Sequence, residues 1–283
     1  MSSDPTIPEA RAADTLTANI ALSSSEWEMQ FKLTVPAGPT TLKELLPLAQ
    51  KMSDAVVDAT VRVVENNGAK ISCCKGCGAC CRQLVPISDV EARRIAELVQ
   101  ALPEPRRSQV LARFTDALQR LSEAGLLEKL NHQERWFSEG YVALGLEYFR
   151  LGIPCPFLED ESCSIHPDRP VTCREFLVTS PAENCRNPTQ ETVKSVHLPM
   201  RVAPALALFS TLEVAPQFVR WVPLVLALEW AAEHPDPPAV QTGPELLGEF
   251  LEHLTGQQIP APQVSASSPT GSRSENDRSM MGT

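Results

Sequence analysis

The sequence predicts a mostly α-helical domain that carries an irregular, cysteine-rich metal-binding loop layer and has disordered termini. Apolar residues recur at helical spacing over several stretches, and the chain's nine cysteines fall into two separate segments. The last 27 residues are rich in Ser, Pro and Gln, which disfavours a packed structure there. With 283 residues, 43% of them hydrophobic, the chain is long enough to bury a full core.

The composition of the chain divides it into four expected parts. A weakly structured N-terminal segment covers residues 1–40 and holds one strand-like run, 27–35, in which apolar and polar residues alternate. A cysteine-cluster metal-binding domain follows over 41–198, and a C-terminal helical region over 199–256 is expected to pack on it. Residues 257–283 are expected to be a disordered tail.

Periodic apolar stretches locate the helices. Ser88 and Glu91 form a capping box at the start of one of them, and Gly256 provides a stop after the last. A short helix is expected to begin at Pro170, because proline is favoured in the first turn. The other predicted helices span 41–67, 106–123, 134–151, 200–213, 216–233 and 243–255.

Charge and hydropathy limit the partners and the compartment. The formal net charge of −10 disfavours nucleic acid and anionic membrane surfaces as partners. The N-terminus has no basic segment followed by an apolar run, so no secretory signal is predicted. The most apolar region, 202–232, is interrupted by charged residues and prolines and is not expected to span a membrane. We therefore expect a cytoplasmic protein, in which clustered cysteines indicate metal or redox chemistry.

A dense cluster of thiols lies at residues 73–81, where five of the nine cysteines occur within nine positions. Thiolates this close repel one another or oxidise unless a soft cation holds them together. The sequence therefore predicts a thiolate site for an iron–sulfur cluster or Zn²⁺. The predicted ligands are Cys74, Cys77, Cys80, Cys81, Cys155, Cys163, Cys173 and Cys185.

The run from Cys74 to Cys80 has the CxxCxxC spacing of the three-ligand segment in bacterial-type ferredoxins. A tight turn brings such cysteines onto one metal, and Gly76 and Gly78 are expected to allow the unusual dihedral angles that the turn needs. The ferredoxin pattern continues to a cysteine where this chain has Leu84. A fourth ligand must therefore come from the distal segment, and Cys155 is a candidate.

The spacing leaves the number and kind of metal ions open. Neighbouring side chains such as those of Cys80 and Cys81 are expected to point apart, so either one is not a ligand or there are two sites. The role of Cys73 is open in the same way. Two zinc ions would use eight cysteines, or fewer with His166 or His197 as substitutes, whereas one [4Fe–4S] cluster would use four. The three-cysteine run favours iron–sulfur.

Three arginines, Arg82, Arg169 and Arg174, flank the cysteines. Their positive charge could offset that of the thiolates, because a nearby opposite charge favours the ionised form. They could equally be ordinary surface residues.

The cysteine motifs resemble those of a known family. The segments Cys74-x2-Cys77-x2-Cys80-Cys81-Arg82, Cys155-Pro-Phe-Leu and Cys163-x5-Arg169-Pro170-x2-Cys173-Arg174 occur in the order found in the YkgJ-type cysteine cluster family. That family is described as carrying a zinc- or iron-chelating domain, and the resemblance covers roughly residues 70–190. It implies a metal-binding protein with a redox or metal-handling role. A tyrosine often takes the position of His166 in the family, which argues against this histidine as a general ligand.

The same family is similar to flagellin lysine-N-methylases, which implies an alternative function as a protein lysine N-methylase that uses S-adenosylmethionine. The spacing Cys73-x3-Cys77-x2-Cys80 matches the three-cysteine motif of radical S-adenosylmethionine enzymes, although the surrounding pattern is helical. A second alternative is a zinc-stabilised helical interaction module without chemistry of its own. No catalytic residue is predicted, and a protein partner is left open.

Overall fold

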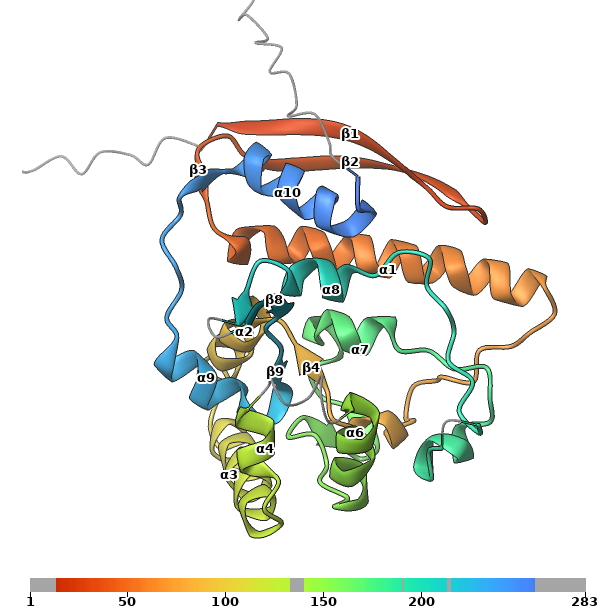
Figure 1. The fold of residues 1–283 in the computed structure, drawn as a ribbon, viewed down its shortest axis with the longest axis vertical. Coiled ribbons are helices and arrows are strands. Elements are labelled where there is room, and N and C mark those ends of the chain that lie inside the picture. Colours follow the sequence, from red (N-terminus) through yellow and green to blue (C-terminus); the bar gives the residue numbers. More distant parts are fainter. Residues whose placement is uncertain (1–13, 133–139, 190, 213–214, 258–283) are drawn as a thin grey trace, which may run out of the picture.

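The computed structural model describes residues 14–132, 140–189, 191–212 and 215–257, and most of the regular structure in them is helical (Figure 1). The helices are α1 (Leu42–Asn66), α2 (Asp89–Gln100), α3 (Arg106–Glu123), α4 (Leu127–Asn131), α6 (Tyr141–Arg150), α7 (Val171–Glu175), α8 (Val202–Ala207), α9 (Ala227–Glu233) and α10 (Gly243–Thr255). Four short 3₁₀ segments accompany them: η1 (Ala79–Arg82), η2 (His166–Asp168), η3 (Ala182–Arg186) and η4 (Leu224–Leu226). The predicted mostly α class is confirmed.

The strands pair only two by two, so the described residues contain no larger sheet. The two long strands form an antiparallel hairpin and the rest are short. They are β1 (Thr15–Ser23), β2 (Glu28–Pro36), β3 (Pro39–Thr40), β4 (Pro86–Ile87), β5 (Leu158–Glu159), β6 (Ser162–Cys163), β7 (Thr211–Leu212), β8 (Ala215–Val219), β9 (Val222–Pro223) and β10 (Gln241–Thr242).

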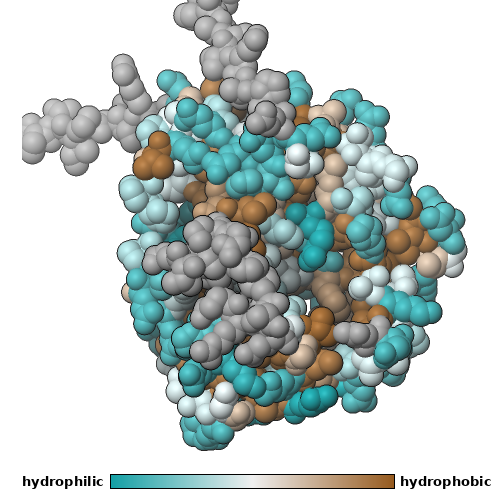
Figure 2. Space-filling view, viewed as in Figure 1, coloured by the Kyte–Doolittle hydropathy of each residue, from teal (hydrophilic) through white to brown (hydrophobic). Residues whose placement is uncertain are grey.

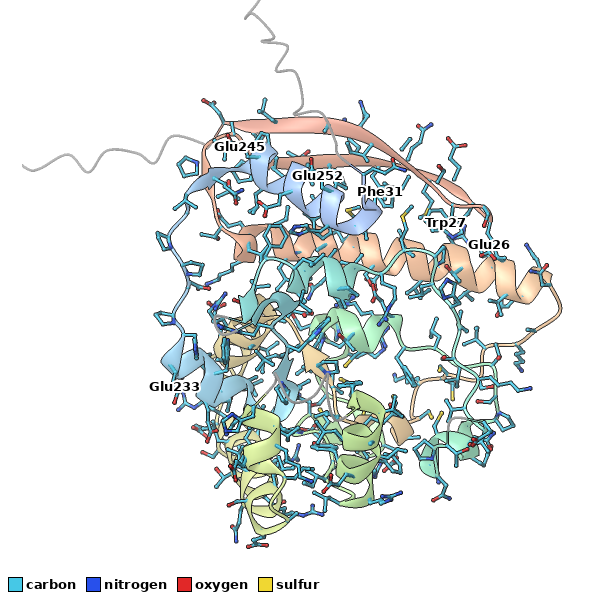
Figure 3. All side chains as sticks on the ribbon, viewed as in Figure 1. Glu26, Trp27, Phe31, Glu233, Glu245 and Glu252 are labelled. Atoms are coloured by element: carbon cyan, nitrogen blue, oxygen red, sulfur yellow. The ribbon has the colours of Figure 1, made fainter. Side chains whose placement is uncertain are left out.

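The β1–β2 hairpin forms one end of the molecule with α10 and α1 beneath it (Figure 1). Alternate residues of its inner face, among them Leu22, Leu33 and Val35, join a core shared with α1, α8 and α10. Trp27 and Phe31 lie toward the turn of the hairpin and pack against the same core (Figure 3). The sequence predicted the second strand and missed the first.

Capping residues define the helices that were predicted best. Ser88 and Glu91 form the capping box of α2, and Thr242 and Glu245 form that of α10. Gly256 ends α10 in the left-handed conformation with φ of 68°. The helices predicted at 41–67, 106–123 and 243–255 are confirmed within one or two residues.

A second apolar region lies below this layer, where α2, α3, α4, α6 and α9 surround two further cores. Short strands β4 and β9 pair between them and connect the first cysteine segment to the C-terminal part. Helix α7 lies between the upper and lower regions and contacts α1 (Figure 1). The cysteines are therefore carried by segments that join the two regions.

Two helix predictions are wrong in part. The stretch predicted as one helix at 216–233 contains β8, β9, η4 and only then α9. Pro216 and Pro223 cannot donate a backbone N–H, which explains why a continuous helix does not form there. The helix predicted at 200–213 is limited to α8. Of the predicted helix 134–151, residues 134–139 lie outside the described part, as does nearly all of the predicted tail.

Hydrophilic and hydrophobic side chains alternate over the face shown in Figure 2, with hydrophilic residues gathered where α10 lies. In the described ranges, every helix is too short or too polar to cross a membrane.

Candidate metal centre

The first cysteine segment is a tight turn followed by a 3₁₀ segment. The backbone N–H of Cys77 donates to the carbonyl of Cys74 at 3.2 Å, and Gly76 has φ of +85°, as the sequence predicted. Gly78 was expected to have an unusual dihedral angle too, but its φ is −87°. A Cβ there would lie 2.7 Å from Leu158 Cδ1 and 3.1 Å from the Cα of Glu161. Gly78 is needed for close packing.

The neighbour that packs on Gly78 is the β5–β6 hairpin, which carries Cys163. Its two turn residues, Asp160 and Glu161, have φ of 47° and 56°, as the common two-residue hairpin turn requires. Arg82 donates two hydrogen bonds to the carboxylate of Glu161, at 2.6 and 3.2 Å, and a third to the carbonyl of Gly78 at 3.0 Å. This bidentate contact ties the distal hairpin to the first cysteine segment.

Backbone contacts fix Cys155 in the same place. Its N–H donates to the carbonyl of Cys81 at 2.7 Å, which joins two cysteine segments far apart in the sequence. Arg113 of α3 donates to the carbonyl of Pro156 at 3.1 Å and to Glu159 at 3.0 Å. Helix α3 therefore supports this loop from its outer side.

Helix α7 carries Cys173, and ionic contacts position it. The Arg174 guanidinium donates to Asp54 of α1 at 2.8 and 3.0 Å, and to the carbonyls of Arg169 at 2.9 Å and Pro167 at 2.5 Å. The buried carboxylate of Glu91, on α2, accepts from the N–H of Val171 at 2.7 Å. Arg174 therefore holds the loop before Cys173 at Pro167 and Arg169, and Glu91 holds it at Val171.

Glu175 anchors the other end of α7. Its carboxylate, only 1% exposed, accepts from the N–H of Val202 at 2.5 Å and so caps the start of α8. Burial raises the pKa of Glu175 to about 7, and burial also raises the pKa of Glu91, against the hydrogen bonds that lower it. The sequence analysis identified Glu91 only as a cap and missed Glu175, since a buried carboxylate cannot be recognised from a single sequence.

One set of thiols, called here the inner thiol group, comes together from four segments. Its members are Cys80, Cys81, Cys155, Cys163 and Cys173.

The thiols of the inner thiol group act on one another through their charges. Burial raises the pKa of Cys155 to about 12, and the neighbouring thiols of Cys163 and Cys80 contribute. Burial, followed by the thiols of Cys155, Cys80 and Cys163, raises the pKa of Cys173 well above its ordinary value. A hydrogen bond with Cys81, then burial, raises that of Cys80.

The remaining four cysteines form the outer thiol group: Cys73, Cys74, Cys77 and Cys185. Cys185, on η3, is buried and packs with Cys77, Ala79 and Val178 in a small apolar cluster. Burial raises the pKa of Cys185 and of Cys73, and thiols of this group and Cys80 add to both shifts. Cys73 and Cys74 themselves are exposed. Of the CxxCxxC run, Cys74 and Cys77 therefore belong to the outer thiol group and Cys80 belongs to the inner thiol group.

The donor chemistry of both groups fits a soft cation. Burial, with smaller contributions from neighbouring thiols, raises the pKa of Cys155, Cys163 and Cys173 and so keeps these thiols protonated, whereas a metal ion would replace those protons. In the described part of the chain, however, no three His, Cys, Asp or Glu side chains are arranged closely enough to hold an ion as they stand. The nine cysteines are free thiols.

The two candidate histidines are less suited to be metal ligands than the cysteines. His166 is exposed, and burial, followed by the charges of Arg169 and Arg174, lowers its pKa. His197 is exposed as well. Neither is among the groups that act on the inner thiols.

Comparison with known proteins supports a metal-chelating domain. Residues 73–194 match the family model described as "CxxCxxCC: Putative zinc- or iron-chelating domain". No curated protein and no solved structure matches the chain. The resemblance to the CxxCxxCC cysteine cluster family, expected from the motifs, is thereby confirmed over residues 73–194 of this chain.

Proposed function

We propose that this chain binds zinc or iron through cysteine thiolates and that the inner thiol group is its tighter site. Cys155, Cys163, Cys173 and Cys80 or Cys81 are the proposed ligands there. The observation that supports this most is the approach of four segments, separated by up to 93 residues, to one set of thiols. Such convergence of soft ligands is typical of structural zinc sites and iron–sulfur sites.

The surrounding contacts hold the segments that carry the inner cysteines, and the thiols themselves must still move together to bind an ion. Arg82, Arg113 and Arg174 each hold a segment that carries one of the inner cysteines. Ligands held by supporting hydrogen bonds bind metal more tightly than mobile ones, because less order must be gained on binding. The bound metal would supply charge for thiolates and, if it is an iron–sulfur cluster, a redox centre.

The outer thiol group is the proposed second and weaker site. Cys73 and Cys74 are exposed on a turn, and only Cys185 is buried. An exposed pair of thiols beside a half-buried set is suited to the exchange of metal with solvent or with a partner. We infer a role in metal handling or electron transfer in the cytoplasm, with catalysis unassigned.

Anaerobic purification followed by metal analysis, acid-labile sulfide assay and an absorption spectrum tests the proposal. Iron with sulfide and broad visible absorbance supports a cluster, whereas stoichiometric zinc without colour supports a structural or metal-handling site. Protein that is folded, reduced and free of both metals, and that takes up neither when they are supplied, would contradict the proposal.

A further inference from the structure

Strand β1 forms the outer edge of the N-terminal hairpin, with β2, α10 and α1 below it in the view of Figure 1. Among the described residues β1 pairs with β2 alone, over nine residues and without a shift in register. The other long side of β1 is therefore an open strand edge. Natural sheets rarely leave a long, regular edge exposed, because its backbone groups can pair with another strand.

Two hydrogen bonds at the ends of the hairpin show which backbone groups of β1 point outward. The carbonyl of Asp14 accepts from the N–H of Ala37 at 2.7 Å, and the N–H of Ser24 donates to the carbonyl of Trp27 at 2.8 Å. Both bonds join residues that lie directly opposite each other when the register of the hairpin is continued past its ends. Hydrogen-bonded and non-hydrogen-bonded pairs alternate along an antiparallel ladder, so the even-numbered residues of β1 bond to β2. The odd-numbered residues direct their N–H and C=O away from β2: Thr15, Thr17, Asn19, Ala21 and Ser23.

The two edges of the hairpin differ in how they are protected. Strand β2 carries Glu28 and Lys32, charges that disfavour a further strand, and it ends at Pro36, which has no N–H. The start of α10 also closes on that end, since a Cβ on Gly243 would collide with the carbonyl oxygen of Pro36. Strand β1, with the sequence TLTANIALS, contains no charge and no proline, and its odd-numbered side chains are small and exposed. The β1 edge is thus the one that can accept a further strand.

We propose that this further strand is β1 of a second copy of the chain, paired antiparallel about a twofold axis at Asn19. In this register Asn19 lies opposite the Asn19 of the second copy, Thr17 lies opposite Ala21, and Thr15 lies opposite Ser23. Only odd-numbered residues then face one another, so each outward N–H meets an outward C=O. The pairing uses the same edge in both copies and therefore closes as a dimer with one four-stranded sheet.

Three features favour a second copy over a different protein as the occupant of the edge. The chain has a formal net charge of −10, so two copies repel unless they meet at an uncharged surface such as β1. Recognition of a foreign strand takes its specificity from pockets for alternate side chains, whereas β1 presents only small side chains to solvent. On the inner face, the half-buried Leu16 and Ile20 would lie opposite Leu22 and Ala18 of the second copy, which continues the apolar face of the sheet.

Sedimentation velocity of the full-length, reduced chain over a range of concentrations tests this pairing. The wild type is expected to show a monomer–dimer equilibrium. The double variant Thr17→Glu, Ala21→Glu should weaken the dimer by about 10-fold or more, because like charges then lie directly opposite each other at both contacts between these positions. The double variant Gln30→Glu, Thr34→Glu makes the same change of charge on the same exposed face of β2. It is the matched control and should dimerise like the wild type.

A mixing experiment tests the register. The double variant Thr17→Lys, Ala21→Lys should also be monomeric alone, whereas an equimolar mixture of the Lys and Glu double variants should pair, because opposite charges then face each other. Hydrogen exchange of the wild type needs no variant. The odd-numbered amides of β1 should gain protection as the concentration rises, while the even-numbered amides are protected throughout.

Three results would overturn the proposal. The first is a wild type that stays monomeric at every concentration, whether its odd-numbered amides exchange freely or are protected by another strand of the same chain. The second is a dimer that persists unchanged in the Thr17→Glu, Ala21→Glu variant, since the contact would then lie elsewhere. The third is a wild-type dimer in which the odd-numbered amides gain no protection.

Discussion

The two thiol groups differ in how firmly the fold holds them. The inner thiol group is assembled from η1, the Cys155 loop, β6 and α7. Arg82 and the N–H of Cys155 join η1 to the two segments after it, whereas other arginines tie the Cys155 loop to α3 and α7 to α1. The outer thiol group has two exposed members on a turn. We infer that the fold brings the segments of the inner group together and that the metal only draws their thiols closer, whereas the outer group depends more on the metal to order it.

The largest expected contrast is in thiol reactivity. Because the pKa of Cys155 is raised to about 12, its thiolate fraction at pH 8 is roughly 1,000-fold below that of an ordinary thiol. Cys74 is also the more exposed of the two thiols, so in metal-free protein it should react with iodoacetamide faster than Cys155, whose own rate should climb as the pH rises. Peptide mass spectrometry after timed alkylation measures both rates. Equal rates at pH 8 would remove the distinction between the groups.

Substitution of one ligand from each group gives the next contrast. Cys173→Ser should weaken the tighter metal site by more than about 100-fold, beyond the loss expected for a residue that only contacts a ligand, because Cys173 is a proposed ligand on a fixed helix. Cys74→Ser should leave that site within a few-fold of the wild type. Competition titrations of the two variants side by side provide the measurement, and the reverse order would place the tighter site in the outer group.

Two glycines of the same turn separate packing from backbone conformation. Gly78→Ala should lower the free energy of unfolding by about 3 kcal/mol, because the added methyl group meets Leu158 and the backbone of Glu161. Gly76→Ala has open space around it, and its positive φ should cost only about 1 kcal/mol. Urea denaturation of metal-free protein measures both losses. Equal losses would indicate that the hairpin does not pack on Gly78.

The smallest expected effect concerns the turn of the β5–β6 hairpin. Asp160 has φ of 47°, a conformation that glycine adopts without strain. Asp160→Gly should therefore raise the free energy of unfolding by about 0.5 kcal/mol, since relief of strain exceeds the entropic cost of glycine. Metal affinity should be unchanged because Asp160 is not a proposed ligand. A clear loss of stability in urea denaturation would show that the Asp160 side chain has a role of its own.

Local signals in the sequence predicted the parts of the fold that depend on neighbours along the chain. Helices α2 and α10 begin at capping boxes, and α10 ends at Gly256. The first strand was missed because small and polar residues dilute its alternation. The helix expected at 216–233 was wrong because apolar content outweighed two prolines in the reading of that stretch.

The sequence predicted the residue type of the candidate ligands, cysteine, and did not predict how these cysteines are arranged in space. The motif spacing identified the cysteines, and the family match over 73–194 agrees with it. The division into two groups depends on how η3 brings Cys185 to Cys77 and how α7 brings Cys173 to Cys155. These are tertiary contacts, as is the close approach of Leu158 to Gly78, and spacing along one chain does not determine them.

X-ray absorption spectroscopy at the metal edge, on protein loaded with one equivalent of zinc, tests the central claim most directly. The Cys73→Ser, Cys74→Ser double variant should give the same spectrum as the wild type, with a shell of sulfur neighbours at about 2.3 Å. That result would place the first metal ion in the inner thiol group. Oxygen or nitrogen neighbours alone in the wild type, or loss of sulfur neighbours in the double variant, would contradict the claim.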